Sequence, residues 1–261
     1  MPALTRCKSL QGVDSEVKSL QIEFEQTQRS TELGSQREAP PLVKICCIAN
    51  VQEARLAQAQ GAAALGLVSA MPSGPGVVAD AVIAEVAAAV RGQRVQTFLL
   101  TAGTDAEHIA AQHAAAGTTT LQLVDEVVVF ELQRLRLRCP GVALVQVVHV
   151  MGPGSLAQAL AVAPWVDALL LDSGNPHAAV KELGGTGRTH DWALSRQIRD
   201  AVAPLPVWLA GGLRVHNVAQ AIKQVRPAGL DLCTGVRSAG ALDARLLAAF
   251  MVAVNEAAGH D

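Results

Sequence analysis

The pattern of hydrophobic and polar positions changes character at residue 42. From there on, short apolar runs alternate with alanine-rich segments whose apolar residues recur at helical spacing. Continuous apolar runs of this length are typical of strands buried on both faces of a parallel sheet. Eight such runs are present, at residues 42–46, 64–68, 95–100, 119–124, 142–150, 166–172, 205–211 and 229–235.

The segments that follow these runs are expected to be helices. Several are introduced by Asn, Asp, Ser or Thr, whose side chains can cap a first helical turn, and glycines follow others where a helix should stop. Helices are predicted to begin near Asn50, Ala79, Thr104, Glu126, Gly154, Thr189, Arg214 and Leu242. Eight alternations predict an α/β fold, a single (β/α)8 TIM barrel over residues 41–261. A doubly wound open sheet is the alternative, because alternation alone does not prove closure.

The first 40 residues have a different texture. They are rich in Gln, Ser, Glu and Arg, and they carry only one weak apolar stripe at helical spacing. The paired prolines at 40 and 41 would stop a helix and begin an extended entry into the first strand. We therefore expect residues 1–40 to form a flexible N-terminal extension.

Composition limits the partners. Among the 261 residues, 21 Lys and Arg balance 23 Asp and Glu, which gives no electrostatic reason to expect nucleic acid or a membrane surface. The five cysteines lack C-x-x-C spacing, the histidines lack helical metal-ligand spacing, and the glycine segments lack nucleotide-binding spacing. We expect no metal, no cofactor and no membrane span, but a cytoplasmic protein with a small-molecule partner. The sequence leaves the oligomeric state open.

A barrel of this kind keeps its active site at the C-terminal ends of its strands, so those ends give the candidate residues. They are Cys46, Asp172, Gly211, Gly212, Thr234 and Gly235. The segments after the second and sixth strands are longer than the others, which favours ligand-binding loops there. Glycines after the seventh and eighth strands let a ligand approach the backbone and point to a phosphate site, although ordinary turns would look the same.

Side-chain alternation places Lys44 and Cys46 on one face of the first strand, with Cys47 toward the helices. If the barrel closes, the first and eighth strands are neighbours. A buried Lys44 would then need a partner, and Asp231 on the eighth strand could supply it. A cysteine such as Cys46, taken alone, is more often a small buried hydrophobic residue, and Asp172 alone could equally be a helix cap or loop organiser. The positions of both at strand ends, together with the glycine turns, favour the functional interpretation.

At this point the segments together resemble a known family. "KICCIANVQEA" is similar to the K-I-C-G opening of the phosphoribosylanthranilate isomerases. "ALLLDS", "GGTGRTHDWAL", "PVWLAGGLRVHNVAQAI" and "GLDLCTGVRSAG" follow in the family's order. The resemblance covers residues 42–257, and "GGTGRTHDW" in the long loop after the sixth strand is its most specific part.

The resemblance implies an aldose-ketose isomerase, an intramolecular oxidoreductase of tryptophan biosynthesis that needs no cofactor. Its substrate would be the phosphosugar N-(5-phosphoribosyl)anthranilate, rearranged to the 1-amino-1-deoxyribulose 5-phosphate. Carried over by position, Asp172 would be the general acid that opens the ring, and Cys46 the general base that removes the C2 proton.

The chain departs from the family on the substrate side. Gly76 stands where the family has the arginine that grips the anthranilate carboxylate, and Val124 stands where it has a histidine. Cys233 replaces a serine, and Arg237 replaces a glutamate. Arg188, in the loop after the sixth strand, is the candidate for a replacement cation.

Three hypotheses therefore stay open at the level of sequence. The chain is an isomerase with a rebuilt carboxylate site, a paralogous barrel that acts on another phosphorylated aminosugar, or a ligand-binding barrel without turnover.

Overall fold

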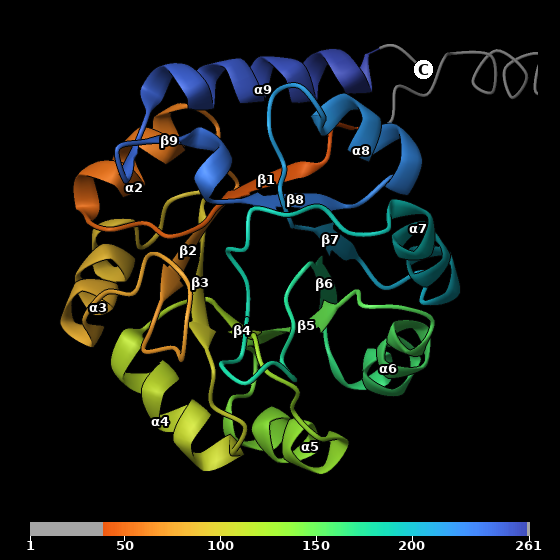
Figure 1. Cartoon of the computed structure of the whole chain (residues 1–261). Coiled ribbons are helices and arrows are strands. Elements are labelled where there is room, and N and C mark those ends of the chain that lie inside the picture. Colours follow the sequence, from red (N-terminus) through yellow and green to blue (C-terminus); the bar gives the residue numbers. More distant parts are fainter. Residues whose placement is uncertain (1–38, 260–261) are drawn as a thin grey trace, which may run out of the picture. The chain divides into compact units, whose positions relative to one another are not determined.

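The computed structural model describes residues 39–259. Eight parallel strands form a closed barrel in the order β1 to β8, and helices surround it (Figure 1). The predicted (β/α)8 barrel is confirmed, and the open sheet is excluded because β1 pairs with β8. The N-terminal extension expected for residues 1–40 falls almost wholly outside the described residues.

The strands agree with the apolar runs of the sequence to within three residues at either end. They are β1 Leu42–Ile45, β2 Ala64–Val68, β3 Gln96–Thr101, β4 Thr120–Leu123, β5 Ala143–His149, β6 Ala168–Asp172, β7 Val207–Leu209 and β8 Gly229–Leu232. The helices are α2 Val51–Ala59, α3 Asp80–Ala89, α4 Ala106–Ala116, α5 Val129–Arg138, α6 Gly154–Val162, α7 Trp192–Ala201, α8 Val218–Val225 and α9 Ala244–Ala258.

Local signals explain where the helices begin and end. The side chain of Asn50 accepts a hydrogen bond from the Glu53 amide and so caps α2. Gly117 ends α4 in the left-handed conformation, as expected of a glycine that stops a helix. The helix α7 begins at Trp192, later than predicted, because Asp191 caps it rather than Thr189.

Two apolar layers hold the barrel together. The larger fills the space between strands and helices and includes Ile45, Leu121 and Phe250. The smaller lies inside the barrel and includes Phe98 and Trp208, whose rings meet edge to face at 5.8 Å. Strands buried on both faces explain why the sequence shows continuous apolar runs instead of alternation.

The segment between β8 and α9 contains elements that the apolar pattern does not predict. The short helix η2 (Thr234–Val236) leads into an antiparallel ribbon of β9 (Arg237–Ser238) and β10 (Ala241–Leu242). A second short helix, η1 (Ala163–Trp165), follows α6. No helix within residues 39–259 is long and apolar enough to cross a membrane.

Candidate active site

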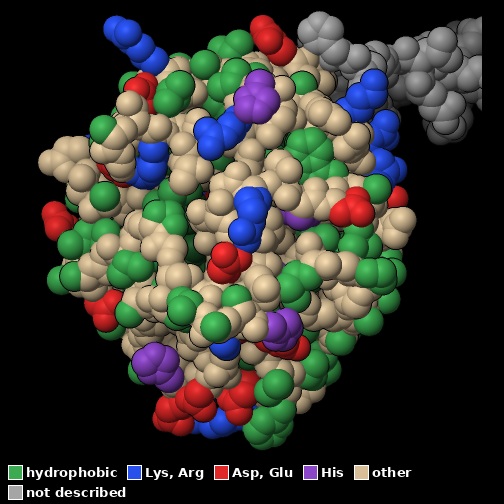
Figure 2. Space-filling view, viewed as in Figure 1, with side chains coloured by type: hydrophobic (Ala, Val, Ile, Leu, Met, Phe, Trp, Pro, Cys, Tyr) green, Lys and Arg blue, Asp and Glu red, His purple; other side chains and the backbone are tan. Residues whose placement is uncertain are grey.

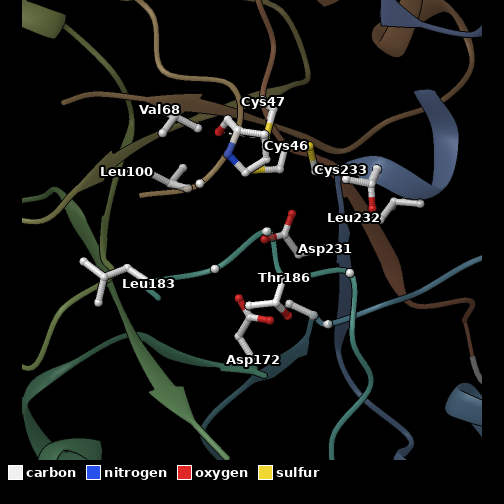
Figure 3. A pocket seen from close by; sticks show the side chains of 18 of the residues that line it. Cys46, Cys47, Val68, Leu100, Asp172, Leu183, Thr186, Asp231, Leu232 and Cys233 are labelled. Carbon is white, nitrogen blue, oxygen red and sulfur yellow. Dashed lines mark hydrogen bonds between the residues drawn. The ribbon is translucent and has the colours of Figure 1, made fainter. Parts of the chain in front are cut away.

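A pocket opens at the C-terminal ends of the strands. Cys46 and Cys47 line it from the end of β1, Asp172 from the end of β6, and Asp231 from β8 (Figure 3). Gly211, Gly212 and Thr234 also line it, as do residues of the loops after β2 and β6. The structure therefore brings most of the predicted site residues into one cavity.

The ion pair predicted between the first and last strands lies at the wall of the pocket, where Asp231 is a lining residue and Lys44 is fully buried. Lys44 and Asp231 are paired in the register of β1 and β8, and Nζ of Lys44 lies 2.8 Å from Oδ2 of Asp231. Burial is the largest influence and would lower the pKa of Lys44, but the charges of Asp231, Cys46 and Cys47 and the hydrogen bond to Asp231 together outweigh it, so the Lys44 pKa is raised overall. The contact expected from sequence is confirmed, and the ammonium lies below Cys46.

A glycine on the neighbouring strand makes room for this arrangement. A Cβ atom on Gly66 of β2 would lie 2.8 Å from Sγ of Cys46 and 3.1 Å from Nζ of Lys44. Contacts this short are not tolerated, so only glycine fits there. The sequence analysis did not single out Gly66, although a glycine inside an apolar strand run is a signal of close approach.

Cys47 does not follow the alternation expected of β1. It was predicted to face the helices, but β1 ends at Ile45, and Cys47 has a φ of 62° that turns its side chain into the pocket. Its Sγ donates to the carbonyl oxygen of Pro75 at 3.6 Å. A left-handed turn breaks the period of two, which corrects the sequence-based placement.

Asp172 has two differently used carboxylate oxygens. Oδ1 accepts hydrogen bonds from the backbone amide of Ser173 at 2.7 Å and from its hydroxyl at 3.4 Å. Oδ2 faces the loop after β6, where a Cβ on Gly184 would lie 3.0 Å from it. Ser173 is in turn held by a 2.7 Å contact between its hydroxyl and that of Thr186. One oxygen is thus anchored, and the other is directed toward the pocket loop.

The glycines after β7 are required by close backbone packing. Gly211 and Gly212 have φ values of 83° and 61°, and a Cβ on Gly212 would lie 2.8 Å from the carbonyl carbon of Arg188. Among the described hydrogen bonds, none has the backbone N–H of Gly211 or Gly212 as donor to another protein group. These amides at the pocket wall suit an anionic ligand.

The turn after β8 packs on the turn after β7. A Cβ on Gly235 would lie 2.2 Å from the carbonyl oxygen of Leu213, so its lack of a side chain serves this packing. Thr234 lines the pocket, whereas Gly235 is not among the lining residues. The two glycine turns predicted from sequence are therefore adjacent, although only the first presents glycines to the cavity.

Arg188 is not among the residues that line the pocket. Its guanidinium pairs with Glu182 at 2.5 Å, and its side chain is 59 % exposed. The described lining contains neither Lys nor Arg. Lys and Arg side chains are scattered over this face of the molecule and form no continuous basic patch (Figure 2). In this arrangement, Arg188 does not take the place of the arginine that the family has at position 76.

Arg237 was identified from sequence only as a difference from the family, but in the structure its guanidinium connects two segments of the barrel. Its guanidinium lies 3.0 Å and 2.9 Å from the two carboxylate oxygens of Glu53 on α2. The same group donates to the carbonyl oxygens of Cys46, at 3.4 Å, and Cys47. Arg237 therefore ties the segment that carries Cys46 to the first helix and to the ribbon after β8.

His190 lies behind the pocket, close to the glycine turn after β7. Its Nε2 is 2.8 Å from the hydroxyl oxygen of Ser195. Burial lowers the pKa of His190, although the charge of Asp172 opposes this. Within residues 39–259, no group of three or more His, Cys, Asp or Glu side chains is arranged to hold a metal ion.

The closed barrel with acid and thiol groups at the C-terminal mouth defines an enzyme-like member of the (β/α)8 class. Residues 43–253 match the family model described as N-(5'phosphoribosyl)anthranilate (PRA) isomerase. The N-(5'-phosphoribosyl)anthranilate isomerase of Synechococcus elongatus is 38 % identical over 208 residues, which cover 77 % of this chain and 90 % of the relative. The one of Haloferax volcanii is 34 % identical over 219 residues, 83 % of this chain and 94 % of the relative.

Solved structures agree with these matches. The phosphoribosyl anthranilate isomerase of Thermotoga maritima superposes with a TM-score of 0.71 at 25 % identity, over 83 % of this chain and 99 % of the other. That of Thermus thermophilus gives a TM-score of 0.69 at 25 % identity, over 82 % and 98 % of the two chains. The chain belongs to the N-(5'-phosphoribosyl)anthranilate isomerase family.

Proposed function

We propose that this chain isomerises N-(5'-phosphoribosyl)anthranilate to 1-(2-carboxyphenylamino)-1-deoxyribulose 5-phosphate. Support comes from curated relatives of that name, which match most of their own length and most of this chain. Family membership favours this function over a barrel for another aminosugar and over a ligand-binding barrel without turnover. The catalytic roles are assigned to Cys46 and Asp172 because both line one pocket beside the glycine turn after β7.

The reaction needs one proton donor and one proton acceptor around a single sugar. In the proposed mechanism, Asp172 gives a proton to the ring oxygen while the bond between this oxygen and C1 breaks, which leaves a protonated open-chain imine. Cys46, as thiolate, then takes the proton from C2, and the electron pair moves toward the nitrogen to form a neutral enaminol. Proton transfer to C1 and return of the C2 hydroxyl proton to the Asp172 carboxylate complete the ketose. Figure 3 shows the two groups on different sides of the cavity, with Asp231 between them in this view.

The environment of each group supports its proposed role. Cys46 lies one alternation above Lys44, and the sulfur of Cys46 contributes to the raised pKa of that lysine. The ammonium of Lys44 is thus a positive charge close to the sulfur that would accept the proton. Asp172 keeps Oδ2 free of the hydrogen bonds that anchor Oδ1. A proton on Oδ2 would therefore be available for transfer.

The phosphate of the substrate would lie against the turns after β7 and β8. The backbone amides of Gly211 and Gly212 and the hydroxyl of Thr234 are the proposed donors. The carboxylate of the anthranilate ring would have to be held without a lining Lys or Arg among the described residues. We also propose that the enzyme works in the cytoplasm, since the described cysteines are free thiols.

The test is a direct assay of the full chain on freshly prepared phosphoribosylanthranilate. Cys46→Ala and Asp172→Asn are each expected to reduce kcat by about 10²–10⁴-fold, the usual contribution of a positioned acid or base. Cys139→Ala is the matched control, because Cys139 is a buried free thiol that does not line the pocket. A parent protein without turnover would contradict the function. An active parent with an unimpaired Cys46→Ala variant would contradict only the role of the thiol.

A further inference from the structure

Two thiols at the rim of the pocket have no role in the proposed reaction. Cys47 follows β1 and Cys233 follows β8, and these strands are hydrogen-bonded neighbours with Ile45 opposite Leu232. The amide of Cys46 continues this ladder by donating to the carbonyl oxygen of Leu232 at 2.9 Å. The strand ends are therefore held together up to the positions of the thiols.

The backbone of Cys47 turns its side chain toward Cys233. With a φ of 62°, Cys47 leaves the strand geometry, and its thiol interacts with the neighbouring thiols of Cys233 and Cys46. Figure 3 shows the three sulfur atoms on the same side of the pocket. A non-glycine residue in the left-handed region is strained, and such strain is often found at functional positions.

Small solutes have two routes to this pair. Cys47 and Cys233 line the active-site pocket, and they also line a neighbouring cavity together with Pro75, Gly76 and Arg237. Cys233 is partly exposed, and the described cysteines are all free. The two thiols thus form part of the wall between the pocket and the second cavity.

The two thiols differ in acidity. The neighbouring thiol of Cys47 lowers the pKa of Cys233, and the charge of Arg237 lowers it further. The thiol of Cys233 in turn raises the pKa of Cys47. Cys233 is therefore the better nucleophile of the pair, with Cys47 next to it as a resolving thiol.

We propose that Cys47 and Cys233 form a modification site, a dithiol that a hydroperoxide oxidises to a disulfide. The disulfide would tie the ends of β1 and β8 together beside Cys46 and Thr234. Loss of isomerase activity on oxidation is the second part of the proposal, and it rests on the function proposed above. The resemblance places glycine and serine at these two positions, so the site belongs to this chain and not to the family pattern.

The chemistry balances with hydrogen peroxide as the oxidant. The thiolate of Cys233 attacks one peroxide oxygen, so that an S–O bond forms, the O–O bond breaks, and hydroxide leaves and is protonated to water. Cys47 then attacks the sulfenic sulfur of Cys233 as its thiol proton is lost. The S–S bond forms, the S–O bond breaks, and the second oxygen leaves as water. Two thiols have supplied the two electrons, and an added dithiol returns them.

The experiment uses the full reduced chain treated with hydrogen peroxide and digested without reduction. Mass spectrometry should find a cross-link between the tryptic peptide with Cys46 and Cys47 and the peptide with Cys233, with fragmentation assigning the bond to Cys47. Isomerase activity should fall in step with the cross-link and return on treatment with dithiothreitol. Cys47→Ser and Cys233→Ser should not form the cross-link, and each variant is compared with its own reduced activity.

Cys139→Ser and Cys7→Ser serve as controls, and both should form the cross-link at the rate of the parent. A bond from Cys233 to Cys46, a bond to Cys7 or Cys139, or oxidation of Cys46 without any cross-link would overturn the site. A cross-link that leaves the activity unchanged would overturn the switch. If the parent has no isomerase activity, peptide mapping still decides whether the disulfide forms, so the site and the proposed function fail separately.

Discussion

A Cβ atom on Gly76 would lie 2.3 Å from the Cβ atom of Cys47. The two positions share one volume, and the side chain of Cys47 occupies it. The family pattern has glycine at position 47 and arginine at position 76, whereas this chain has cysteine at 47 and glycine at 76. The missing arginine is therefore part of a paired change across the loops after β1 and β2.

This relationship predicts that arginine at position 76 requires a smaller residue at position 47. Gly76→Arg alone should lower the free energy of unfolding by about 2 kcal/mol or more, because of the clash and the φ of 81°. Adding Cys47→Gly should restore part of that stability. If the new guanidinium reaches the substrate carboxylate, KM of the double variant should fall about ten- to a hundredfold. Urea denaturation and steady-state kinetics measure the two effects.

Cys47→Gly alone is the control for the pair. It should leave KM near the parent value, because it removes a side chain without adding a charge. A Gly76→Arg protein as stable as the parent would show that the two positions do not compete.

Gly66 gives a prediction about the position of the proposed base. Gly66→Ala would place a methyl group 2.8 Å from Sγ of Cys46 and displace the thiol. Since a misplacement of about 1 Å can cost roughly a hundredfold in rate, kcat should fall by about that factor, with a smaller change in KM. Gly154→Ala is the matched control, because nothing lies within 4 Å of a Cβ there. Equal kcat values for Gly66→Ala and Gly154→Ala would show that the position of the Cys46 thiol does not affect the reaction.

The ion pair between Lys44 and Asp231 predicts strongly unequal effects of single and double substitutions. Lys44→Met or Asp231→Leu alone should each cost about 3–5 kcal/mol of unfolding free energy, since each leaves a buried charge unpaired or forces it to neutralise. The double variant should be more stable than the less stable single variant. A double-mutant cycle by urea denaturation measures this coupling.

The exposed pair of Arg196 and Asp200 provides the comparison. Arg196→Ala should cost less than about 1 kcal/mol, as is usual for surface ion pairs. Additive effects at Lys44 and Asp231 would mean that the buried pair contributes no more than the surface pair does.

Much of the fold and of the site follows from local sequence signals. Apolar runs locate the strands because strands buried on both faces cannot contain many polar residues. The contact of Lys44 with Asp231 could be predicted on the condition that the barrel closes, since a buried ammonium requires a partner and the first and last strands would then be neighbours. Cys46 and Asp172 were found because the fold dictates that its active site lies at the strand ends.

The remaining features depend on backbone turns and distant contacts that no local pattern encodes. Alternation places Cys47 correctly only while the strand continues, and it fails where the chain turns left-handed after β1. The contact of Arg237 with Glu53 joins residues 184 positions apart, so it could not be read from spacing. Arg188 was chosen for its charge alone, whereas Glu182 in the same loop determines where its guanidinium lies.

Arg237 is predicted to position Cys46 without touching the substrate. Arg237→Lys keeps the charge but loses the paired donors to Glu53 and to the carbonyl oxygens after β1. We expect kcat to fall by about tenfold, the value of one charge-assisted hydrogen bond, with KM less affected. Arg136→Lys is the control, because Arg136 also pairs with a carboxylate and donates to a backbone carbonyl oxygen, but lies away from the pocket. A larger change in KM than in kcat would assign Arg237 to substrate binding.

His190 predicts how the stability of the enzyme depends on pH. Burial lowers the pKa of this imidazole in the folded protein, whereas in the unfolded chain it titrates near about 6.5. Below that value the imidazole binds a proton more readily in the unfolded chain than in the folded protein. The free energy of unfolding therefore falls as the pH falls from about 6.5 through the lower pKa of the folded state. The contribution is fully present above the unfolded value. Urea denaturation at a series of pH values between 5 and 8 measures the slope, and His190→Gln should flatten it.

The exposed His108 on α4 supplies the control for this slope. His108→Gln should leave the pH dependence as steep as in the parent, since this side chain is exposed and is not buried on folding. Glutamine at 190 keeps a group that can pair with the hydroxyl of Ser195, so a loss of packing would lower stability equally at every pH. A His190→Gln protein that is less stable than the parent yet keeps the parent slope would therefore show that another group carries the pH dependence.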